Sequence, residues 1–163
     1  MIKNTTKQET VSDGIAKYLS DIGVRVMFGV ISIHNMPILD AIARQNIIRF
    51  VPTRGEAGAI NMADAYSRVS GKLGICITST GTAAGNAAGS QLEALTAESR
   101  LLHITTQIDT KFLDGNSSAI HSVPHQPDML KSISKAYYFI KSPKTAIETL
   151  SNAISSAISP PSG

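Results

Sequence analysis

The residues with the clearest chemical potential lie in one run, from Pro52 to Gly89. Glu56 stands at the beginning of an alanine-rich segment, GEAGAINMADAYSRVSG, which predicts a helix. An apolar strand, LGICITS, follows, and then a turn of small residues, TGTAAGN. The positive end of a helix dipole stabilises a carboxylate in the first turn, and small uncharged neighbours let a flat molecule approach it. This arrangement suits a carboxyl group that shares a proton with a bound ligand.

A purely structural role for Glu56 is the alternative, because acidic residues are common in the first turn of surface helices. The turn at residues 80–86 can likewise be read as a tight strand-to-helix connection. It matches neither the G-x-G-x-x-G fingerprint nor a P-loop with its Lys and Ser/Thr. The sequence therefore gives no direct support for a nucleotide-binding loop there.

The elements that position these residues alternate between strands and helices. Strands are predicted over residues 24–30, 47–52, 73–78, 101–106 and 136–140, and helices over residues 10–21, 36–45, 55–71, 83–96, 128–133 and 142–158. Such alternation predicts an α/β fold with a parallel sheet covered on both faces. Ligands bind such sheets at the carboxyl ends of the strands, where Glu56, the turn at residues 80–86 and the irregular stretch 107–127 all fall.

The composition limits the classes of function that are expected for this chain. The 163 residues are 42% hydrophobic and carry a net charge of +3, which favours a single domain. The basic residues are scattered, whereas a nucleic-acid surface needs a basic stripe. No apolar run is long enough to cross a membrane, and a single cysteine forms no internal disulfide, so a reducing cytoplasm is the expected compartment. The polar residues 1–8 are expected to be disordered.

Histidine and cysteine side chains are candidate metal ligands or nucleophiles. His121 and His125 are four residues apart, but Pro124 disfavours a helix and no third ligand is near, so no metal site is predicted. His103, inside the strand LLHITT, is expected to be a satisfied core or rim residue. Cys76 lies in an apolar strand without an electropositive neighbour, which indicates packing.

The run from Arg54 to Asn86 resembles the N-terminal, pyrimidine-binding domain of thiamine-diphosphate-dependent enzymes of the acetolactate synthase and benzoylformate decarboxylase type. The pattern of that family is R-x-E-x-x-A-x-x-M-A-x-x-Y-(A/S)-R-x-(S/T)-G-x-x-G, followed by a small-residue turn ending in Gly-Asn. The matching positions are Arg54, Glu56, Ala59, Met62, Ala63, Tyr66, Ser67, Arg68, Ser70, Gly71, Gly74, Gly85 and Asn86.

The resemblance implies a three-layer α/β/α fold with a six-stranded parallel sheet, and a decarboxylase or carboligase that acts on 2-oxo acids. It implies that Glu56 activates the aminopyrimidine of thiamine diphosphate, and that Ser79, Thr80 and Asn86 lie against the cofactor or the substrate. It also implies that His121 lines the substrate channel, although a solvated loop histidine is the simpler alternative. A flavin, found in some relatives, is not indicated.

Two departures from the family pattern limit the resemblance. The first strand is followed by FGVISIHN, so Ile31 and Ser32 replace a Pro-Gly turn. This favours, as an alternative, a non-catalytic binding module of the same fold. The Gly-Asp-Gly and Asn-Asn motifs that hold diphosphate and Mg²⁺ in the family are missing. Residues 1–163 are therefore expected to form one domain of a longer chain, with middle and diphosphate-binding domains, in a homo-oligomer whose second subunit completes each site.

Overall fold

A four-stranded parallel sheet forms the centre of the structure, a computed structural model that describes residues 9–113 and 119–163. The strands are β1 (Val26–Gly29), β2 (Arg49–Pro52), β3 (Gly74–Thr78) and β4 (Leu101–Thr105), in the order β2-β1-β3-β4. The central strand β3 is buried along its whole length, because Ile75 and Ile77 enter one core and Cys76 enters the other. The predicted α/β class and parallel sheet are confirmed.

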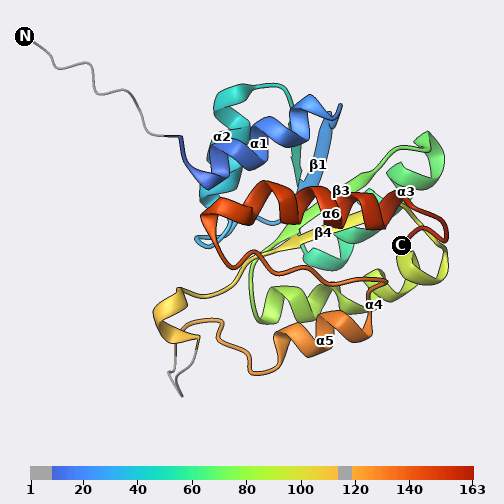
Figure 1. Cartoon of the computed structure of the whole chain (residues 1–163). Coiled ribbons are helices and arrows are strands. Elements are labelled where there is room, and N and C mark those ends of the chain that lie inside the picture. Colours follow the sequence, from blue (N-terminus) through green and yellow to red (C-terminus); the bar gives the residue numbers. More distant parts are fainter. Residues whose placement is uncertain (1–8, 114–118) are drawn as a thin grey trace, which may run out of the picture.

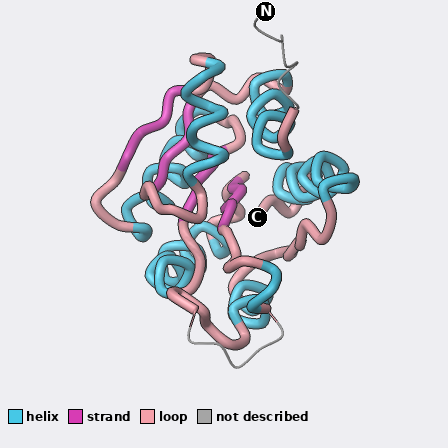
Figure 2. The backbone as a smooth tube through the Cα atoms, turned by 90° about the vertical axis from the view of Figure 1, so that its left-hand side faces the viewer, coloured by secondary structure: helices cyan, strands magenta, loops and turns pink. Residues whose placement is uncertain are grey.

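Helices cover both faces of this sheet, as Figures 1 and 2 show. On one face, α1 (Val11–Asp21), α2 (Met36–Gln45) and α6 (Ala146–Ile158) pack with β1 and β3 into the larger core. On the other face, α3 (Glu56–Ser70) and α4 (Thr82–Thr96) pack through small residues, Ala59, Ala63 and Ala87. The short α5 (Gln126–Ser132) lies against α4, and two 3₁₀ turns, η1 (Thr110–Phe112) and η2 (Pro143–Thr145), join the remaining segments.

Local sequence signals set the ends of these helices. Thr10 and Asp13 form a capping box at the start of α1, where hydrogen bonds from the Thr10 backbone and hydroxyl hold the pKa of the Asp13 carboxyl well below its usual range. Asn46 and Gly71 adopt left-handed conformations that end α2 and α3. Pro37 occupies the first turn of α2, as its fixed φ favours.

Two residues of the family motif have structural roles in this fold. Arg68 makes a two-pronged ion pair with Asp64 on α3, at 2.7 and 2.8 Å, and Ser99 donates to the same carboxylate. This network ties α3 to the segment that leads into β4. A Cβ atom on Gly74 would lie 2.1 Å from the Ala63 carbonyl oxygen, so only glycine lets α3 lie this close to β3.

The six-stranded sheet implied by the resemblance is wrong for the described residues, whose sheet has four strands. Residues 136–140, expected to form a strand, form no strand and no ladder. They line, together with β4, a cavity of about 410 Å³. The side chains of Tyr138, Phe139 and Ile140 are about 40% exposed. An apolar, β-prone sequence is thus insufficient where no partner strand is present.

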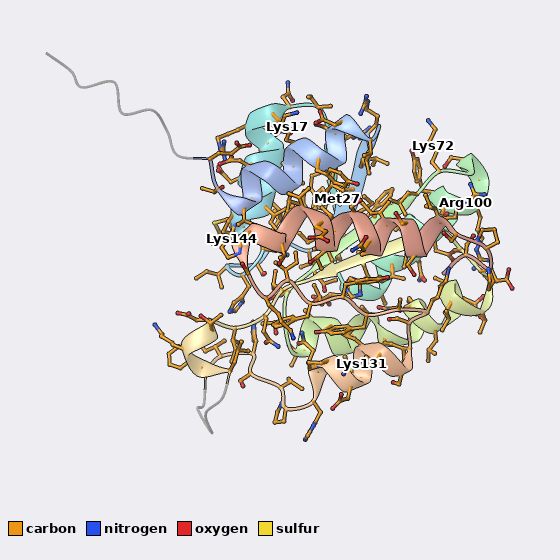
Figure 3. All side chains as sticks on the ribbon, in the orientation of Figure 1. Lys17, Met27, Lys72, Arg100, Lys131 and Lys144 are labelled. Carbon is orange, nitrogen blue, oxygen red and sulfur yellow. The ribbon has the colours of Figure 1, made fainter. Side chains whose placement is uncertain are left out.

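The labelled basic side chains are scattered over the structure, as the sequence predicts. In Figure 3, Lys17, Lys72, Arg100, Lys131 and Lys144 lie on separate parts of the periphery, whereas Met27 lies in the interior. Within the described ranges, no helix is both long and apolar enough to cross a membrane. The expected disorder of residues 1–8 concerns residues that lie outside the described ranges.

Candidate functional site

Glu56 and Asn86, two of the predicted site residues, come together between α3 and α4. Gly55 precedes α3 in an extended conformation, so Glu56 is its first residue. The Asn86 Nδ2 atom on α4 donates to Glu56 Oε2 at 3.2 Å. This bond joins side chains 30 residues apart and orients the half-buried carboxylate at the positive end of the α3 dipole.

The space around this pair is open. A Cβ atom built on Gly55, Gly58 or Gly85 would meet no heavy atom within 4 Å. Glycine is therefore not required at these positions for packing within the chain. The beginnings of α3 and α4 thus leave room for a flat ring beside the Glu56 carboxylate.

Ser79 and Thr80 follow β3, where the sequence places them, but their side chains have different surroundings. Thr80 is fully buried, and its hydroxyl donates to Gln126 Oε1 at 2.9 Å. The Gly81 N–H donates to the same oxygen at 2.5 Å. The Ser79 carbonyl accepts from Thr105 Oγ1 at 2.7 Å. The Thr80 side chain therefore holds the start of α5 and is not accessible to a ligand.

His121 lies against the same turn. It has a positive φ of 65°, and its carbonyl oxygen would be 2.2 Å from a Cβ atom on Gly81. Its ring centroid is 5.7 Å from that of His34, which follows β1. The His34 Nδ1 atom lies 3.4 Å from Ser79 Oγ. His34, which was not among the predicted site residues, thus lies between His121 and Ser79.

The loop that carries His34 is the one that departs from the family pattern. Asn35 is fully buried, donates to the Val30 carbonyl at 2.9 Å and accepts from the Ser32 N–H at 2.9 Å. These two bonds fix the turn that a Pro-Gly pair would otherwise form. The signal for this role is an asparagine in the loop after β1, because Asn side chains bond nearby backbone groups in turns.

The contacts of the remaining candidates, His103, Cys76 and His125, indicate structural roles. His103 bonds through Nε2 to Thr78 Oγ1 at 2.8 Å and through Nδ1 to Gln91 Oε1 at 2.6 Å, and its burial lowers its pKa to about 4. Burial likewise raises the pKa of the Cys76 thiol, which keeps it protonated. Exposed His125 pairs with Asp128 at 3.4 Å. Among the described residues, no three His, Cys, Asp or Glu side chains are grouped closely enough to bind a metal.

Comparison with known families identifies the architecture. Residues 9–132 match the family described as thiamine pyrophosphate enzyme, N-terminal TPP binding domain. The chain belongs to this family. The matched region contains Glu56, Asn86, His34, His121 and the whole four-stranded sheet, so the resemblance inferred from the sequence motif is confirmed.

Curated relatives of the chain are enzymes of this family. A probable 2-ketoarginine decarboxylase of Pseudomonas aeruginosa is 30% identical over 147 residues, which are 90% of this chain and 26% of that protein. A probable acetolactate synthase large subunit of Methanocaldococcus jannaschii is 29% identical over 138 residues, 85% of this chain and 23% of that protein. The chloroplastic acetolactate synthase of Arabidopsis thaliana is 31% identical over 129 residues, 79% and 19% respectively. The chain thus spans about a quarter or less of these relatives' length.

Sequence reasoning missed His34 and Gln126. His34 stands in a loop and gave no periodic signal, although it lies within the segment that departs from the family pattern. Gln126 is a buried amide that bonds Thr80, Gly81 and the Thr106 carbonyl. Its partners are separated from it by 20 to 46 residues, so no local pattern could reveal its burial.

Proposed function

We propose that this chain is the pyrimidine-binding domain of a thiamine-diphosphate-dependent enzyme that decarboxylates 2-oxo acids or joins them to a second carbonyl compound. The observation that carries the proposal is the Glu56–Asn86 pair at open helix ends. A carboxyl group held at a helix start beside an uncrowded surface fits a cofactor ring that must exchange a proton. The names of the relatives support the same reaction classes.

The role of Glu56 follows from its surroundings. Bound thiamine diphosphate would supply a nucleophilic carbon that attacks a carbonyl group and accepts the electrons released with carbon dioxide. Glu56 would hold a proton between its carboxylate and the aminopyrimidine ring, which is the step that activates the cofactor. The Asn86 amide, bonded to Oε2, fixes the rotamer of Glu56 and leaves Oε1 to meet the ring. The backbone at Ser79 and Thr80 would border the cofactor or the substrate.

Other parts of a longer protein would complete this site. The described residues fit the pyrimidine half of the cofactor, but they include no cluster for Mg²⁺. We therefore propose that a diphosphate-binding domain, contributed by a second subunit of a homo-oligomer, holds the diphosphate and Mg²⁺. The short span of the chain relative to its relatives supports this arrangement. A cytoplasmic location remains the expectation from the single buried cysteine, and nothing indicates a flavin.

The test is Glu56→Gln in the longer protein, with Glu148→Gln as a matched control in the first turn of α6. Carbon dioxide release is measured with pyruvate, benzoylformate and 2-ketoarginine. An amide cannot exchange the proton, so turnover should fall by about 10²-fold or more. The control should keep wild-type turnover, and calorimetry should show thiamine diphosphate binding in both variants. Wild-type turnover in Glu56→Gln would remove Glu56 from the mechanism.

A non-catalytic binding module is the second candidate, and the altered loop after β1 favours it. Ile31 and Ile33 in this loop are 58% and 77% exposed, which suits a docking surface better than a substrate pocket. This candidate predicts that the longer protein releases no carbon dioxide from any 2-oxo acid in the presence of thiamine diphosphate and Mg²⁺. Turnover of one such acid would exclude it.

A further inference from the structure

The edge of the sheet opposite Glu56 contains a second cavity, called here the amino-edge cavity. It has a volume of about 480 Å³ and lies where the amino ends of β1 and β3 meet the C-terminal turns of α1, α3 and α6. Sites for small molecules in proteins have volumes of about 300 to 1,000 Å³. The amino-edge cavity is therefore large enough for a small organic ligand.

Most of the lining of the amino-edge cavity is apolar. Aliphatic side chains, among them Ile22, Leu73 and Ile158, are joined by the phenol rings of Tyr18 and Tyr66. Ile22 and Ile158 are each 44% exposed, so apolar surface faces water inside a concave site. Burial of such surface under the apolar part of a ligand is favourable.

The charged residues of the lining are both basic, Arg25 and Lys72. They directly precede the neighbouring parallel strands β1 and β3, so both cations stand at the same edge. In the described part of the chain, the Arg25 guanidinium bonds only through Nη1, to the carbonyls of Ser20 and Val24. Lys72 bonds only through its backbone N–H, to Ser70 Oγ at 3.2 Å. The Lys72 ammonium and the other N–H groups of Arg25 can therefore meet a ligand.

The helices that end at this edge would disfavour an anion if their last carbonyls were left without donors. Each of these ends is met by a basic side chain. Arg25 donates to α1, Arg100 donates to the Gly71 carbonyl at the end of α3 at 2.7 Å, and Lys135 donates to two carbonyls at the end of α6. Since none of these ends uses Lys72, its charge remains available to an anion.

We infer that the amino-edge cavity binds a small amphipathic carboxylate, an organic acid with an aliphatic or aromatic tail. The carboxylate accepts charge-assisted hydrogen bonds from Lys72 and Arg25, and the tail packs against the apolar lining. No acidic residue lines the cavity, so an anion meets no like charge there, whereas a cation meets two. The site does not depend on the proposed function, because Glu56 and Asn86 lie at the other edge of the sheet.

The test titrates the complete chain with octanoate, octanol and octylammonium, which share one alkyl chain and differ in charge. Calorimetry below micelle-forming concentrations gives the affinities, and backbone amide chemical shifts locate the bound molecule. Lys72→Gln removes the charge and Lys72→Glu reverses it. Lys144→Glu is the matched control, because Lys144 is also exposed and lies far from Lys72 in Figure 3.

Octanoate should bind the wild type about 10-fold more tightly than octanol or octylammonium, because only octanoate forms the charge-assisted bonds. Lys72→Gln should weaken octanoate by about 10-fold, Lys72→Glu should make octylammonium the better ligand, and Lys144→Glu should match the wild type. The amide shifts of Gly23 and Leu73 should change, and that of Ile140 beside the other cavity should not. Absence of octanoate binding, equal affinity for the three probes, undiminished octanoate binding by Lys72→Glu, or shifts confined to residues 136–140 would overturn the assignment.

Discussion

The carboxyl ends of β1 and β3 and the outer edge of β4 differ in how their polar groups are satisfied. At the carboxyl ends, the buried amides of Asn35 and Gln126 bond five different groups on neighbouring loops. Beside β4, a cavity of about 410 Å³ is lined by the strand and by residues 136–140, which form no ladder with it. The first region fixes backbone positions, whereas in the second no described strand pairs with the outer side of β4.

This difference indicates where the fold needs rigidity. The carboxyl ends of β1 and β3 hold His34, His121 and the turn after β3. Ligand binding would require the geometry of these groups to be kept within a fraction of an ångström. On β4, the His103 side chain joins Thr78 to Gln91. Substitutions in the purified chain should therefore lower its stability more at the carboxyl ends of β1 and β3 than along residues 136–140.

Gly81→Ala should have the largest effect. Alanine at a φ of 66° is strained, and its Cβ atom would collide with the His121 carbonyl oxygen. The two effects together should lower the free energy of unfolding by about 3 to 4 kcal/mol. Gly85→Ala is the control, since a Cβ atom there meets nothing within 4 Å and alanine favours the α4 helix by up to about 1 kcal/mol. Denaturant unfolding that gives the same change for both would contradict the close packing at Gly81.

Gln126→Ala should follow, with a loss of about 2 to 3 kcal/mol. The substitution leaves the buried Gly81 N–H without its acceptor, and the Thr80 hydroxyl keeps only the Gln107 oxygen at 3.1 Å. Gln107→Ala is the matched control, because this half-buried amide accepts from Thr80 at 3.1 Å and from the backbone N–H of Ile108. If urea unfolding showed equal losses of unfolding free energy for the two variants, the hydrogen bonds of Gln126 would not be the main stabilising ones.

Much of the fold, but little of this network, could be predicted from the sequence. The apolar periodicity over residues 36–45 gives the bounds of α2, and the four described strands each fall within a predicted one. The final helix begins at Ala146, later than residue 142, because Ser142 and Pro143 start a 3₁₀ turn that precedes it. Periodicity and capping signals are local, so they identify elements and their faces.

Contacts between residues far apart in the chain leave no local pattern in the sequence. The family motif led to Glu56 and Asn86, and the structure joins them. No motif led to His34 or Gln126, since burial of a loop amide depends on segments that only the fold brings together. The strand expected at residues 136–140 failed for the same reason, because strand formation requires a partner as well as a β-prone sequence.

His103 should give the edge of β4 a dependence on pH. Its pKa is about 4 in the folded chain and 6.5 ordinarily, so the neutral form is favoured by folding. Its contribution is full above pH 6.5 and is lost as the pH falls toward 4, by about 2 kcal/mol between pH 7 and pH 5. The difference between the unfolding free energies of wild type and His103→Gln should shrink over this range. A constant difference for His103→Gln would contradict burial of a neutral ring.

Ile140→Ser should have the smallest effect, a loss below about 1 kcal/mol. The Ile140 side chain is 39% exposed beside the cavity, so little apolar surface leaves the core when serine replaces it. Ile77→Ser is the matched comparison, because Ile77 is fully buried on β3 and should cost several times more. If both substitutions lowered the unfolding free energy equally, residues 136–140 would pack against β4 as firmly as a strand. The contrast between the two regions would then lie in hydrogen bonding alone.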